Sequence, residues 1–132
     1  MIEVKNLTKY YGDHLAVDNV SFNVEKGEIL GLLGPNGAGK STTMNMLTGY
    51  ISSSSGQALI NGIDILEDPI RAKANIGYLP ELPPLYLDMK VIEYLRFLYE
   101  LKKVKKNPNI KQTQQEYLEQ IMELVKIKEV SD

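Results

Sequence analysis

The first third of the chain alternates apolar and polar residues, as β-strands with one buried face do. Residues 2–12 (IEVKNLTKYYG) begin with this alternation and end at a glycine turn. Residues 15–28 continue it, with four apolar positions: Val17, Val20, Phe22 and Val24. A turn then follows at Lys26-Gly27. We therefore expect a hairpin or a meander with one face buried.

The next segment, residues 28–34 (EILGLLG), is almost continuously apolar. That pattern predicts a strand covered on both faces, as in a parallel α/β sheet. A helix is expected to begin at Gly39 or Lys40 and to stop at Gly49.

The middle of the chain carries several turn signals. Residues 52–56 (SSSSG) are expected to form a surface loop. Asn61-Gly62 lies between apolar residues, which is a strong hairpin signal. Residues 75–81 (NIGYLPE) are expected to form a short strand that Pro80 interrupts.

The last third has the periodicity of two amphipathic helices. Residues 90–102 place Val91, Leu95 and Leu98 on one stripe, and Asp88 is expected to cap this helix. The lysine-rich run 102–106 indicates a solvated helix end. The second helix, within residues 112–130, is also amphipathic and carries four apolar residues: Leu118, Ile121, Leu124 and Val125.

Composition narrows the class of protein. At 132 residues, with 43% hydrophobic and 24% charged residues, the chain suits one soluble globular domain. The net charge of −2 gives no reason to expect nucleic acid. The absence of cysteine excludes disulfides and thiolate metal sites. No apolar run approaches the roughly 18 residues that span a bilayer, although the chain could still dock on a membrane protein.

Residues 34–41 (GPNGAGKS) match the phosphate-loop pattern G-x-x-x-x-G-K-[ST] in full. Its glycines let backbone N–H groups curl around phosphates at the positive end of a helix. Lys40 would neutralise phosphate charge, the Ser41 hydroxyl would ligate Mg²⁺, and Thr42 would contact a phosphate oxygen. The candidate nucleotide-binding set within this motif is Asn36, Gly37, Ala38, Gly39, Lys40, Ser41 and Thr42. The alternative is a glycine-rich turn that binds nothing.

Together with this loop, three further stretches carry a resemblance to a family: LTKYYG at 7–12, GQALINGIDI at 56–65 and IGYLPE at 76–81. The chain resembles the N-terminal part of an ABC-transporter ATP-binding domain, most like the exporter-type ATPases. The resemblance implies an α/β P-loop NTPase fold of the ABC-ATPase type, with an N-terminal antiparallel β region. It implies one incomplete domain, in which residues 1–81 form the β region and phosphate-loop core and residues 82–132 begin a helical subdomain.

The resemblance also implies sites outside the loop. Tyr11 matches the aromatic residue that stacks on adenine, and Ala16 matches a small residue near the base. Glu81 stands where the family usually has a glutamine that touches Mg²⁺, so it is a second candidate metal ligand. The alternatives are that Tyr11 simply packs the hairpin and that Glu81 is a surface carboxylate.

Two elements that the family needs for hydrolysis do not occur in this sequence. There is no apolar run followed by Asp-Glu, and no Gly-Gly dipeptide that could belong to the Leu-Ser-Gly-Gly-Gln signature. The chain is therefore expected to be part of a domain that binds nucleotide without hydrolysing it efficiently, and no residue within it is assigned as catalytic. The apolar segment 28–33 would be left with an unpaired edge, so we expect the chain to self-associate or to be marginally stable.

The leading functional hypothesis is an ATP-binding subunit of an ABC transporter, with ATP and Mg²⁺ as cofactors. It would work at the inner face of the cell membrane, with a transmembrane permease and a second ATP-binding protomer, head to tail, as partners. Tyr94, Leu95 and Leu98 lie in the region that contacts the permease in the family, although periodicity alone also fits core residues. The alternative function is a non-hydrolysing nucleotide-binding module; a small-molecule kinase is disfavoured by the aromatic hairpin before the loop.

Overall fold

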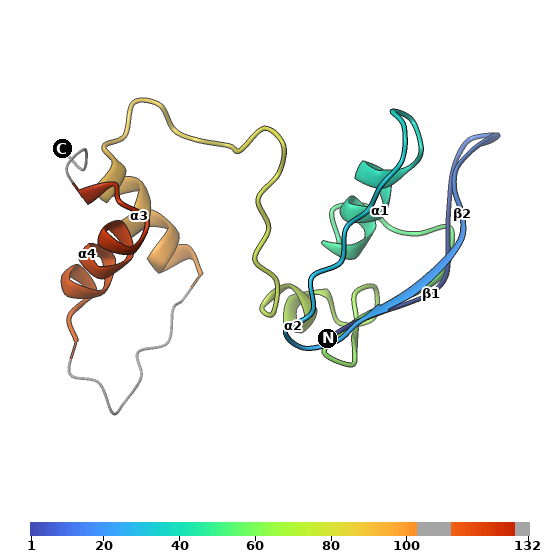
Figure 1. Cartoon of the computed structure of the whole chain (residues 1–132), viewed down its shortest axis with the longest axis horizontal. Coiled ribbons are helices and arrows are strands. Elements are labelled where there is room, and N and C mark those ends of the chain that lie inside the picture. Colours follow the sequence, from blue (N-terminus) through green and yellow to red (C-terminus); the bar gives the residue numbers. More distant parts are fainter. Residues whose placement is uncertain (103–111, 129–132) are drawn as a thin grey trace. The chain divides into compact units, whose positions relative to one another are not determined.

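The computed structural model describes residues 1–102 and 112–128. The chain divides into two compact units, Met1–Leu79 and Pro80–Asp132. The first contains a sheet and two helices, and the second contains two further helices (Figure 1).

The first unit is built on an antiparallel sheet of four strands in the order β2-β1-β3-β4. Its strands are β1 (Ile2–Tyr11), β2 (His14–Val24), β3 (Ser55–Ile60) and β4 (Ile63–Asp64). The two predicted hairpins are both confirmed. Asn61 and Gly62 have φ values of 50° and 76°, the left-handed pair that a tight hairpin turn requires.

The β1–β2 hairpin bends strongly along its length (Figure 1). Asn6 and Asn19 both have positive φ, and the Asn6 side-chain amide donates to Asn19 Oδ1 at 2.7 Å. The register between the strands shifts at this point, as it does at a β-bulge. The bulge explains why the apolar positions of β2 step by three between Val17 and Val20 instead of by two.

Helix α1 (Lys40–Leu47) starts and stops where the sequence predicts, with Gly49 in the left-handed conformation just beyond its end. Together with the short helix α2 (Pro69–Lys73), α1 packs on the sheet. The buried cluster that joins them consists of Val4, Leu7, Val17, Met46, Leu47, Ala58, Ile60, Ile65 and Ala72. The helix that begins at the phosphate loop is therefore anchored in the core of the first unit.

Two strand predictions are wrong. Residues 28–33 are not a strand within the described chain, and the side chains of Ile29 and Leu33 are each 97% exposed. Residues 75–81 are likewise irregular. The physical reason is the same in both cases: a strand exists only where a neighbour completes its hydrogen bonds, and no described strand pairs with either segment.

The second unit contains α3 (Val91–Leu101) and α4 (Gln114–Leu124), which confirms both predicted helices. The prediction that Asp88 caps α3 is wrong, because the N-cap is Lys90, whose backbone N–H donates to Glu93 at 3.1 Å. At α4, Thr113 donates to Glu116 from its backbone N–H and its hydroxyl, which lowers the pKa of that carboxyl. Most of the lysine-rich run 102–106 lies outside the described residues.

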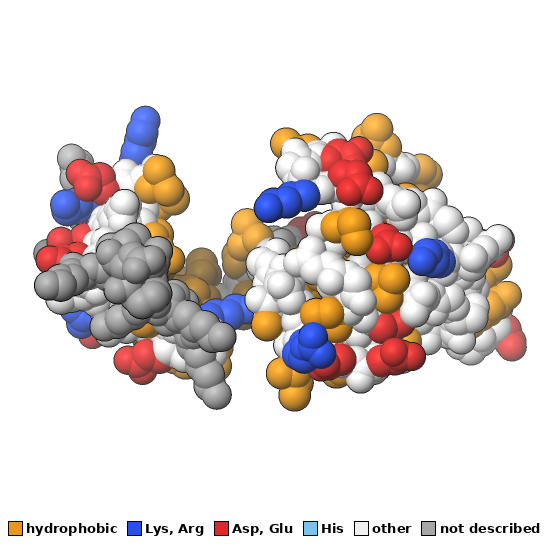
Figure 2. All heavy atoms as spheres, turned by 90° about the horizontal axis from the view of Figure 1, so that it is seen from below, with side chains coloured by type: hydrophobic (Ala, Val, Ile, Leu, Met, Phe, Trp, Pro, Cys, Tyr) orange, Lys and Arg blue, Asp and Glu red, His pale blue; other side chains and the backbone are white. Residues whose placement is uncertain are grey.

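On the face shown in Figure 2, hydrophobic side chains reach the surface at several places, among acidic and basic side chains. The exposed set in the first unit includes Leu30, Tyr50, Ile70 and Leu79. In the second unit it includes Leu82, Leu87 and Leu124.

Candidate phosphate-binding site

The loop from Gly34 to Gly39 is wrapped around the Lys40 side chain. Lys40 Nζ donates to the carbonyl oxygens of Gly34 at 2.6 Å and Pro35 at 2.7 Å. A turn closed by the Ala38 N–H on the Pro35 carbonyl, at 3.2 Å, shapes the loop between them. The ammonium is thereby held at the mouth of the loop, and its third N–H remains for an anion.

The backbone N–H groups that follow are free to bind an anion. The first bond of α1 runs from the Thr43 N–H to the Gly39 carbonyl at 2.8 Å. Within the part of the chain that the structure describes, the N–H groups of Lys40, Ser41 and Thr42 have no hydrogen-bond acceptor. All three donors lie in the first turn of α1 (Lys40–Leu47), at the positive end of the helix dipole, which is the arrangement that binds phosphate.

Gly39 connects this loop to the sheet. It adopts φ 80°, and a Cβ built on it would lie 2.4 Å from the carbonyl oxygen of Ala16 in β2. Only glycine allows the loop to approach the strand this closely. The structure thus brings Ala16, which the sequence placed near the base, against the start of α1.

The side chains predicted to bind phosphate and metal lie near the solvent. Asn36, Gly37 and Ala38 are exposed, and so is Ser41, whose hydroxyl has no partner among the described residues. The adjacent Thr43 hydroxyl instead donates to the Gly39 carbonyl at 2.9 Å. Ser41 and the half-buried Thr42 are therefore the hydroxyls of the first turn that remain available to a ligand within the described residues.

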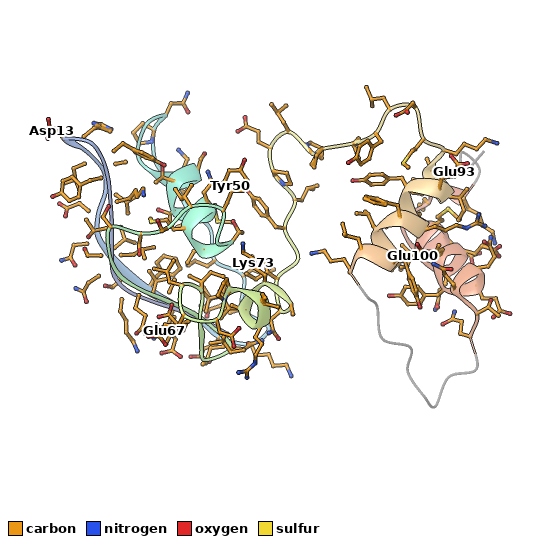
Figure 3. The ribbon with its side chains drawn as sticks, turned by 180° about the vertical axis from the view of Figure 1, so that it is seen from behind. Asp13, Tyr50, Glu67, Lys73, Glu93 and Glu100 are labelled. Atoms are coloured by element: carbon orange, nitrogen blue, oxygen red, sulfur yellow. The ribbon has the colours of Figure 1, made fainter. Side chains whose placement is uncertain are left out.

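Tyr11 lies at the end of β1, beside the hairpin tip that Asp13 marks in Figure 3. Its side chain is 48% exposed. The ammonium of Lys9 lies 5.3 Å from the centre of its ring. The sequence interpretation did not include Lys9, although a residue two positions before Tyr11 on a strand is the natural candidate for sharing its face.

Ser41 fits one ligand position of a magnesium ion, because Mg²⁺ bound with a nucleotide takes few protein oxygens besides phosphates and water. Glu81 is exposed and belongs to the second unit, so its pairing with Ser41 stays a prediction. Among residues 1–102 and 112–128 there is no group of three acidic or histidine side chains that could hold a metal by itself.

Comparison with known proteins bears on this site directly. The family model for the ABC transporter matches residues 17–132, which include the whole phosphate loop. The chain belongs to the ABC transporter family. It is 50% identical over 97 residues to the probable multidrug ABC transporter ATP-binding protein YbhF of Escherichia coli (strain K12). It is 48% identical over 105 residues to the uncharacterized ABC transporter ATP-binding protein MJ1023 of Methanocaldococcus jannaschii.

A solved structure of an ATP-binding subunit of an ABC transporter superposes on 99% of this chain with a TM-score of 0.80 and 28% identity. This likeness confirms the predicted fold class, the P-loop fold of ABC ATPases.

The chain spans only part of the proteins it matches: 17% of YbhF, 36% of MJ1023 and 53% of the solved structure. Within the described residues, no helix is long and apolar enough to cross a membrane.

Proposed function

We propose that this chain is the nucleotide-binding part of an ABC transporter ATPase, which binds Mg-ATP through residues 34–42. The observation that carries the proposal is the conformation of the phosphate loop. Lys40 is held by two loop carbonyls, and the first three N–H groups of α1, its own among them, are unpaired. The helix N-terminus therefore carries a fixed ammonium beside three free donors, which is what an anion site requires.

Each predicted residue has a role in this proposal. Lys40 and the N–H groups of the loop, from Asn36 to Thr42, hold the phosphates, and the Ala38 N–H would exchange its 3.2 Å bond to the Pro35 carbonyl for one to phosphate. Ser41 and Glu81 hold Mg²⁺, which would offset phosphate charge when bound. Tyr11 stacks on adenine, a contact of roughly 1–3 kcal/mol by analogy with other base–aromatic stacks. Ala16 leaves room for the base.

In the whole protein, ATP binding and hydrolysis would drive transport through a transmembrane permease. ABC ATP-binding subunits generally pair with transmembrane components and dimerise, so we propose a head-to-tail partner protomer and a position on the inner face of the membrane. Tyr94, Leu95 and Leu98 are half-buried in the second unit, which is compatible with a permease-facing surface. The name of the relative YbhF, a probable multidrug transporter, supports the exporter-type placement.

Titration of the chain with Mg-ATP tests the binding proposal. Lys40→Met should weaken binding by about 10- to 100-fold, because hydrogen bonds to a charged group contribute about 1.5–3 kcal/mol. Lys26→Met is the matched control, since Lys26 is exposed in a turn and the change in charge is the same. Equal affinity in the wild type, Lys40→Met and Lys26→Met would contradict phosphate binding by this loop.

A second candidate function, nucleotide binding without hydrolysis, is favoured by the absence of an Asp-Glu pair from the sequence. Release of phosphate from Mg-ATP at steady state separates the two. We expect the chain by itself to release phosphate no faster than Lys40→Met does. Faster release would contradict the binding-only function and would point to Glu81, or to a group from a second chain, as the base.

A further inference from the structure

The outer half of β1 is fastened to the loop between α1 and β3. Three hydrogen bonds join them: Ser54 N–H to the Thr8 carbonyl at 2.9 Å, the Tyr10 N–H to Ser54 Oγ at 3.0 Å, and Lys9 Nζ to the Ser52 carbonyl at 2.8 Å. The serine-rich stretch, which the sequence suggested was only a surface loop, thus holds the strand that carries Tyr11.

Lys9 is the member of this set that reaches Tyr11. Its ammonium lies 5.3 Å from the centre of the Tyr11 ring, within the distance of a cation–π interaction. The bond to Ser52 fixes the ammonium at one place instead of leaving it to sample many rotamers. One face of the aromatic ring is therefore covered by a tethered cation.

The ring nevertheless keeps a free surface. Tyr11 is 48% exposed, and the structure assigns its hydroxyl no hydrogen bond within residues 1–102 and 112–128. An aromatic ring has two faces on which flat groups can stack. With Lys9 on one of them, a planar base has the other.

We infer that Lys9 is a positioning residue for the nucleotide base: anchored by the Ser52 carbonyl, it holds the Tyr11 ring in the orientation that receives a purine. This inference rests on the proposed function, because it takes the bound ligand to be a nucleotide. It differs from that function because it concerns the base alone: the structure gives Lys9 no hydrogen bond or ion pair with residues 34–42.

The experiment compares Mg-ATP with magnesium tripolyphosphate, which offers phosphates without a base. Lys9→Met removes the charge and keeps an unbranched side chain, and Lys9→Arg keeps the charge. Lys5→Met is the matched control, because Lys5 lies on the same strand with a side chain 55% exposed and pairs with Glu3 instead of an aromatic ring. Tyr11→Leu and the double variant Lys9→Met/Tyr11→Leu complete the cycle.

We expect Lys9→Met to weaken Mg-ATP binding by about two- to fivefold, the size of an exposed cation–π contact. Tripolyphosphate affinity should stay unchanged, Lys9→Arg should recover most of the loss, and Lys5→Met should have no effect. In the Tyr11→Leu background, Lys9→Met should cost nothing further, because the ring it orients is gone.

Three results would overturn the inference. Equal losses for ATP and tripolyphosphate would mean that Lys9 acts by general charge attraction. An undiminished Lys9→Met effect in the Tyr11→Leu background would mean that it acts through another group. If the wild type bound both ligands with equal affinity and Tyr11→Leu had no effect, phosphate binding would stand but there would be no base site at Tyr11. Absence of binding to either ligand would instead contradict the proposed function itself, and this inference with it.

Discussion

The two units of the molecule bury very different amounts of apolar surface. The first has a contiguous core of nine buried hydrophobic residues shared by its sheet and both of its helices. In the described part of the second, Leu118 and Met122 are the buried hydrophobic residues, and α3 has none. Burial of apolar surface is the main stabilising term in folding. The first unit therefore buries enough apolar surface to fold by itself, whereas the second unit buries little.

This difference matches the placement of the candidate site. All the predicted nucleotide ligands lie in the first unit, on or beside elements that enter its core. Glu81 alone belongs to the second unit. Phosphate binding should therefore depend on the core of the first unit and tolerate damage to the helices of the second.

The strongest test of this comparison is a pair of identical substitutions, Met46→Ala in α1 and Met122→Ala in α4. The two side chains are 1% and 2% exposed. Removal of a buried methionine side chain typically costs about 2–5 kcal/mol of stability. We expect Met46→Ala to abolish Mg-ATP binding, since α1 presents Lys40 and Ser41, and Met122→Ala to leave it intact.

Hydrogen exchange followed residue by residue is the appropriate measurement, because it reports the stability of each unit separately. Met122→Ala should lower protection in α3 and α4 only. Equal loss of protection across residues 1–79 would show that the units fold as one body and would break the comparison.

A second, smaller effect is expected from alanine at two glycines of the phosphate loop. Gly37 and Gly39 have φ values of 82° and 80°, so alanine meets the same backbone strain at both, about 1 kcal/mol. At Gly39 the new Cβ would also lie 2.4 Å from the Ala16 carbonyl, whereas at Gly37 it meets open space. Gly39→Ala should therefore cost about 1–3 kcal/mol more, as overpacking does.

Thermal unfolding and Mg-ATP titration of both variants measure that difference. Gly39→Ala should lower the melting temperature of the first unit and weaken nucleotide binding more than Gly37→Ala. Similar behaviour of the two variants would mean that the contact of the loop with β2 does not fix the site.

Sequence reasoning succeeded where the signal is local. Asn61-Gly62 specifies its own turn, and the phosphate-loop glycines and Gly49 bound α1 without reference to distant residues. The bulge at Asn6 and Asn19 was missed, because it depends on the cross-strand bond between two side chains that the sequence separates by 13 positions. Lys9 is only two positions from Tyr11, but the bond that holds its ammonium over the ring was missed for a similar reason, because the acceptor is the distant Ser52 carbonyl.

Segment 28–33 shows a case in which a local pattern is not enough to predict the structure. Its apolar pattern predicts a strand, but a pattern states only which side chains suit a buried sheet and supplies no neighbour. The prediction failed in the described structure because a strand is a property of a pair. The pattern does identify apolar side chains that a buried sheet would cover. In the described structure two of them, Ile29 and Leu33, remain exposed.

The smallest expected effect on folding comes from placing a charge in this exposed apolar segment. Ile29→Lys and Leu33→Lys replace side chains that are 97% exposed, so each should change the free energy of unfolding by no more than about 0.5 kcal/mol. Both should nevertheless reduce self-association, because a charge in this exposed apolar segment discourages it from pairing as a strand with another chain. Sedimentation velocity over a concentration series measures this, with Ile70→Lys as control, since Ile70 is 84% exposed but lies in α2.

An equal reduction by Ile70→Lys would assign association to exposed apolar surface in general. A wild type that stays monomeric throughout would show that segment 28–33 does not recruit a second chain.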